Sequence, residues 1–94
     1  MKGSEKQVAW ASELKDAATK TISEFISYAT VVGAPASTIT DWTARLNKLN
    51  ACDIAGAIID QFHGFSRTGD LKKDAVALES KYRIGTNCYG YKFI

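Results

Sequence analysis

The candidates for nucleophilic and acid–base chemistry are Cys52, Asp53, Asp60, His63 and Cys88. Catalysis needs a nucleophile or base held within hydrogen-bond reach of an orienting partner. Asp53 and Asp60 are seven residues apart, so on one helix they would share a face about 10 Å from each other. That spacing suits two solvated charges better than a paired acid and base. The sequence therefore predicts that the protein is not an enzyme and has no catalytic residue. We expect His63 to stabilise the negative end of a helix.

Metal binding is limited by the small number of sulfur and imidazole groups. The chain has 2 cysteines and 1 histidine, and the cysteines form no CxxC pair. The usual zinc spacings are absent, so we expect no metal and no cofactor. We favour two free thiols in a reducing compartment; the alternative is a single Cys52–Cys88 bridge that pins the C-terminal tail.

The C-terminal tail combines aromatic side chains with bases. Its candidate binding residues are Arg83, Tyr89, Tyr91, Lys92 and Phe93. Such a group can stack on nucleobases and contact phosphates. It can also form a protein interface or add a strand to another sheet, or it can cover the end of the helical core.

Trp10 is the candidate binding residue outside the tail. It lies at the margin of an apolar helical stripe, whereas Trp42 lies within one. Trp10 therefore either packs in the core or, partly exposed, anchors a partner protein, because interface hot spots favour tryptophan.

A long helix is expected over residues 5–31. Ser4 and Gln7 can form a capping box at its start, and Gly33 and Pro35 signal its end. Its apolar residues recur at three- and four-residue steps; they are Trp10, Ala11, Leu14, Ala18, Ile22, Phe25 and Ala29.

Three shorter helices should pack on the long one. We expect Ser37 or Thr38 to cap the first of them. Asn50 should cap the second and Asp70 the third. Their stripes are Ile39, Trp42, Leu46 and Leu49; then Ile54, Ala55, Ile58, Ile59 and Phe62; then Leu71, Ala75, Leu78 and Tyr82.

After these helices the period changes. Aromatic residues alternate with others over residues 88–94, as in a strand, and residues 85–87 form a turn that would allow a hairpin with residues 82–84. The predicted fold is a single all-α domain over residues 1–94, or α+β if the hairpin forms. It has a long N-terminal helix, three shorter helices and a C-terminal strand or hairpin within residues 83–94.

Composition places the chain among globular proteins, at 46% apolar and 23% charged residues. The net charge of +2, from 12 basic and 10 acidic residues, is far below that of a dedicated duplex-DNA binder, so nucleic acid is neither required nor excluded. The N-terminal residues 1–4 carry no apolar signal-peptide core, and no apolar run is long enough to span a membrane. We therefore expect a cytoplasmic protein.

Two segments resemble a known kind of module. Residues 4–11, SEKQVAWA, resemble the opening (S/T)-E-K-Q-x-x-W-A of short helical segments in bacterial and bacteriophage proteins. Residues 53–60, DIAGAIID, resemble a second landmark of those segments. The resemblance covers residues 4–62 and implies a module of phage and other mobile elements with no assigned reaction.

Together these observations predict a non-catalytic protein-binding module. The form implied by the resemblance is a phage or mobile-element protein that binds and modulates a host protein in the host-cell cytoplasm, for example as an inhibitor of a host defence complex. The alternative is a small nucleic-acid-binding accessory protein that uses its basic, aromatic C-terminal third.

Overall fold

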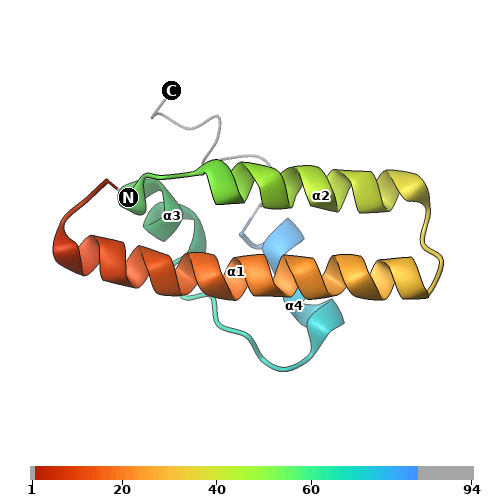
Figure 1. Cartoon of the computed structure of the whole chain (residues 1–94). Coiled ribbons are helices and arrows are strands. Elements are labelled where there is room, and N and C mark those ends of the chain that lie inside the picture. Colours follow the sequence, from red (N-terminus) through yellow and green to blue (C-terminus); the bar gives the residue numbers. More distant parts are fainter. Residues whose placement is uncertain (1, 83–94) are drawn as a thin grey trace.

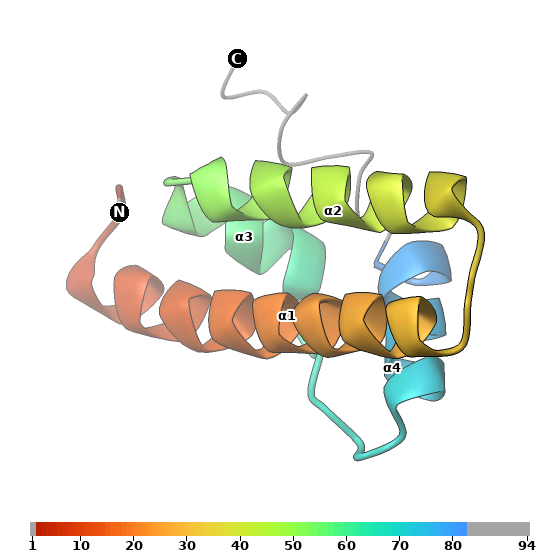
Figure 2. The ribbon, with the colours of Figure 1, turned by 45° about the vertical axis from the view of Figure 1, so that its right-hand side comes forward.

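The computed structural model describes residues 2–82, which form four helices: α1 (Glu5–Val31), α2 (Ala36–Ala51), α3 (Ala55–Phe62) and α4 (Leu71–Ser80). Figure 1 shows α1 and α2 side by side and antiparallel. Helix α3 lies against the first half of α1 and α4 against the second half, as Figure 2 also shows. The predicted long helix with three shorter ones is confirmed, whereas the predicted strand or hairpin at residues 83–94 lies outside the described residues.

The start of α1 is fixed by its capping box. The Ser4 hydroxyl accepts a hydrogen bond from the Gln7 backbone N–H at 3.2 Å, and the Gln7 side chain accepts one from the Ser4 N–H at 3.1 Å. The chain leaves the helix at Gly33, whose φ of 76° few other residues adopt. Both predicted ends of this helix are therefore confirmed.

The core lies where the three shorter helices meet α1. From α1 it takes mainly small side chains, which allow close approach of the helices. Large apolar side chains from the other elements fill the remaining space. The fully buried or nearly buried apolar residues of this cluster include Ala11, Leu14, Ala18, Ile22, Trp42, Leu49, Ile58, Phe62, Phe65 and Leu78.

Helix α2 begins before the predicted caps Ser37 and Thr38. Its first residue is Ala36, and its N-cap residue is Pro35, which makes no side-chain cap. The Pro35 carbonyl accepts from the Thr38 N–H at 3.0 Å. The fixed φ of proline, here −55°, already suits the first turn, so the hydroxyl caps are not needed.

The end of α2 also differs from the prediction, because Asn50 is helical and caps nothing. The ammonium group of Lys15, on α1, lies 3.0 Å from the carbonyl oxygen of Asn50 and 2.8 Å from that of Cys52. A cation is favourable at this negative helix end. The Lys15 contact therefore satisfies carbonyls that the end of a helix leaves without intrahelical partners.

Helix α3 begins at Ala55 because the N-terminus of the chain pairs with the segment before it. The Lys2 N–H donates to the Asp53 carbonyl and the Lys2 carbonyl accepts from the Ala55 N–H, both at 2.8 Å. This parallel bridge between Lys2 and Ile54 supplies the acceptor that a side-chain cap would otherwise provide. Beside it, Gly3 has a φ of 148°, and an added Cβ there would lie 2.9 Å from the Ala55 Cβ.

Substitution of Gly3 by alanine should destabilise the protein. The strained φ and the contact with Ala55 together should lower the free energy of unfolding by about 1–3 kcal/mol. The matched control is Gly56→Ala, because a Cβ at this helical position meets nothing within 4 Å; it should be neutral or stabilising by up to about 1 kcal/mol. Urea unfolding of both variants measures the difference, and a Gly3→Ala variant as stable as Gly56→Ala would contradict the N-terminal bridge.

Candidate functional site

Asp53 and Asp60, two of the residues first considered for catalysis, do not lie on one helix. Asp53 lies in the extended link before α3, whereas Asp60 lies within α3, so the predicted shared helical face does not form. The cause is the late start of α3. Cys52 is buried and is a free thiol. Among residues 2–82, no group of three His, Cys, Asp or Glu side chains could hold a metal ion.

His63 is the C-cap of α3, one residue beyond the predicted last turn. Its Nδ1 lies 3.3 Å from the Ile59 carbonyl oxygen, and its backbone N–H donates to the same oxygen at 2.9 Å. The imidazole therefore lies at the C-terminal end of α3, where the sequence placed it.

Five of the six candidate binding residues, Arg83, Tyr89, Tyr91, Lys92 and Phe93, lie outside the described residues, as does Cys88. The sixth, Trp10, is 49% exposed on α1. Its position one step from the buried Ala11 turns the indole to the edge of the packed face. Lys6 and Glu13, one turn before and after Trp10, are both exposed. Trp10 is thus a large, half-exposed aromatic group between two exposed charged residues of α1.

Trp42 has the opposite environment and is 6% exposed. The ring of Phe25, from α1, packs against it with 4.9 Å between centroids. The Arg45 guanidinium lies 4.6 Å from the centre of the Trp42 ring and forms an ion pair of 2.7 Å with Glu79 of α4. Trp42 is therefore a core residue, as predicted, and its contacts connect α1, α2 and, through Arg45, α4.

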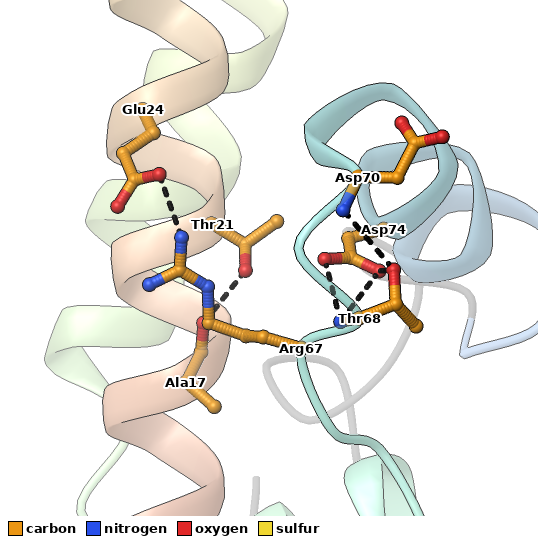
Figure 3. Close-up of polar contacts among 7 residues, drawn as sticks. All are labelled: Ala17, Thr21, Glu24, Arg67, Thr68, Asp70 and Asp74. Carbon is orange, nitrogen blue, oxygen red and sulfur yellow. Dashed lines mark hydrogen bonds and ion pairs between the residues drawn. The ribbon is translucent and has the colours of Figure 1, made fainter.

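The loop before α4 contains a polar cluster that the sequence analysis missed. The Asp74 side chain is buried, at 3% exposure. Its oxygens accept from the Thr68 N–H at 3.0 Å and from the Thr68 hydroxyl at 2.7 Å, as Figure 3 shows. Asp70 caps α4 by accepting from the Lys73 N–H at 3.1 Å, as predicted. These bonds fix the loop to the first turn of α4.

Two cations of the basic C-terminal third contact α1. Arg67 donates to Glu24 at 2.6 Å, a contact that Figure 3 shows reaching from the loop to α1. The Lys72 ammonium lies 5.2 Å from the centre of the Tyr28 ring. Hydrogen bonding with Tyr28 raises the pKa of Lys72. Both cations thus help to hold the loop and α4 on α1.

Comparisons with family models, with curated proteins and with solved structures find no match for this chain. Within residues 2–82, the helices are too short or too polar to cross a membrane.

The two tryptophans should respond differently to truncation. Trp42→Ala removes a ring from the core and should lower the free energy of unfolding by about 3–5 kcal/mol. Trp10→Ala removes a half-exposed ring and should lower it by about 1 kcal/mol or less. Chemical denaturation followed by far-UV circular dichroism measures both losses. Equal losses in the two variants would show that Trp10 belongs to the core.

Proposed function

We propose that this chain is a non-catalytic protein-binding module whose anchor is Trp10. The observation that carries the proposal is the 49% exposure of a tryptophan on a helix that is otherwise firmly capped and packed. Tryptophan is the side chain most enriched at interface hot spots, where one ring surrounded by polar groups supplies much of the binding energy. A rigid helix presents that ring at little conformational cost.

The exposed apolar residues favour a binding surface with one anchor residue rather than a broad apolar patch. The other large apolar residues exposed in the described part of the chain are Val31, Val32 and Val76. Val31 lies about 32 Å along α1 from Trp10, at 1.5 Å per residue. An interface centred on Trp10 therefore has charged neighbours at its rim, which is typical of partners that associate and dissociate.

The proposed partner is a host protein. This step depends on the resemblance of residues 4–11 and 53–60 to modules of phage and mobile elements. In that setting the chain would act in the cytoplasm of the host cell and modulate its partner by occupying a surface, as an inhibitor of a defence complex does.

Nucleic-acid binding is the second candidate function. It is favoured by Lys73 and Lys81, two exposed lysines on α4 and its C-cap that form no ion pair within residues 2–82. Two such cations supply few phosphate contacts, so we rank this function below protein binding.

Affinity capture from a bacterial lysate tests the proposed function. Trp10→Ala should weaken binding of the captured protein by about 2 kcal/mol or more, roughly 30-fold. Val31→Ala truncates an apolar side chain that is 85% exposed on the same helix, and it should bind like the unchanged protein. Nuclease treatment should leave the captured protein in place.

Three outcomes would overturn the proposal: equal capture by Trp10→Ala and the unchanged protein, equal loss in Val31→Ala, or release of the captured protein by nuclease. Release by nuclease, with binding that weakens steeply as salt rises, would favour nucleic-acid binding instead.

A further inference from the structure

A second surface feature lies away from Trp10, between α4 and the segment 64–68. It is a hollow of about 220 Å³ that opens to solvent. One wall is the stripe of α4 and its C-cap that carries Lys73, Ala77 and Lys81. The residues of this stripe are four apart, so they lie on one helical face. We call this feature the α4 hollow.

The shape of the α4 hollow is held by contacts on its remaining sides. Gly64, with a φ of 85°, turns the chain at the end of α3. The rings of Phe65 and Tyr82 meet edge to face with 5.4 Å between centroids and supply apolar lining. The bonds from Thr68 to Asp74 hold the loop against α4. The hollow is therefore already formed before any partner binds.

The charged side chains that line the α4 hollow are two lysines, Lys73 and Lys81, and one carboxylate, Asp74. Glu79, on the same helix, is paired with Arg45. The carboxylate of Asp74 is buried and engaged by the Thr68 N–H and hydroxyl. Lys73 and Lys81 are exposed at the two ends of the stripe, and the Lys81 ammonium lies 5.4 Å from the centre of the Tyr82 ring.

We propose that the α4 hollow binds an extended acidic segment of a protein partner, with one apolar side chain in the hollow and a carboxylate at each lysine. Lys73 and Lys81 are about 12 Å apart along the helix at 1.5 Å per residue. In an extended peptide, side chains four residues apart are separated by about 13 Å. The matching pattern is therefore an acidic residue, a spacer, an apolar residue, a spacer and a second acidic residue.

An acidic peptide fits this hollow better than a nucleic acid does. Nucleic-acid affinity depends on neutralising many phosphates, whereas this rim offers two lysines with the Asp74 carboxylate nearby. The apolar lining suits an aliphatic side chain, and the hollow is smaller than the pockets that hold whole small molecules. The α4 hollow does not include Trp10, so this proposal can be tested separately from the proposed function.

The test is a titration of ¹⁵N-labelled protein, followed by amide chemical shifts, with the capped peptide Glu-Gly-Leu-Gly-Glu. Saturable shifts should appear at the amides of residues 64–68 and 73–81. The peptide Gln-Gly-Leu-Gly-Gln should bind at least about tenfold more weakly, because charge-assisted contacts are lost. A short oligothymidylate is titrated in parallel.

The variants separate this site from general charge attraction. The double variant Lys73→Gln/Lys81→Gln should bind the acidic peptide at least about tenfold more weakly. The matched control Lys6→Gln/Lys20→Gln removes two exposed lysines from α1 and should bind it normally. Equal binding of both peptides, equal loss in both double variants, shifts confined to other residues, or tighter binding of the oligothymidylate through Lys73 and Lys81 would each overturn the proposal.

Discussion

The ammonium group of Lys15 links α1 to the point where α2 ends and the chain continues to α3. From the side of α1 it reaches the carbonyl oxygens of Asn50 and Cys52, where α2 ends and the extended link to α3 begins. The end of a helix carries partial negative charge and unpaired carbonyls, so one cation both satisfies these groups and fixes the position of α2 on α1. The link that leaves this point then pairs with Lys2, and α3 starts from that pairing.

Helix α4 packs in the core through the buried Ala75 and Leu78, and polar contacts at its periphery add to this packing. Arg67 and Lys72 connect α4 and its loop to α1, and Arg45 connects α4 to α2. Each exposed ion pair contributes little to stability, so the buried Thr68–Asp74 hydrogen bonds do more to fix the conformation of the loop before α4. All four helices thus share one apolar core, and polar contacts shape the surface of α4 and its loop.

Capping and spacing rules correctly predicted the helix ends that depend on residues close in sequence. The capping box of α1, its end before Gly33 and the Asp70 cap of α4 involve residues close in sequence, so composition and spacing were sufficient. The Asn50 cap was wrong because partners distant in sequence, Lys2 and Lys15, determine where α2 ends and α3 begins. The burial of Asp74 was missed because it depends on the loop conformation. The sequence did not decide whether Trp10 is exposed, because the exposure of a side chain at the margin of an apolar stripe depends on its neighbours in space.

The bridge between Lys2 and Ile54 also has a consequence for the order of folding. It joins Lys2 to Ile54, near the middle of the chain, so it closes a loop that contains all of α1 and α2. Closing such a loop costs conformational entropy, and the two hydrogen bonds of the bridge do not offset that cost until the helices have packed. During synthesis Lys2 emerges before Ile54 and lacks this partner until both long helices have been made. The bridge therefore forms late, and changes at Gly3 should alter the unfolding rate rather than the folding rate.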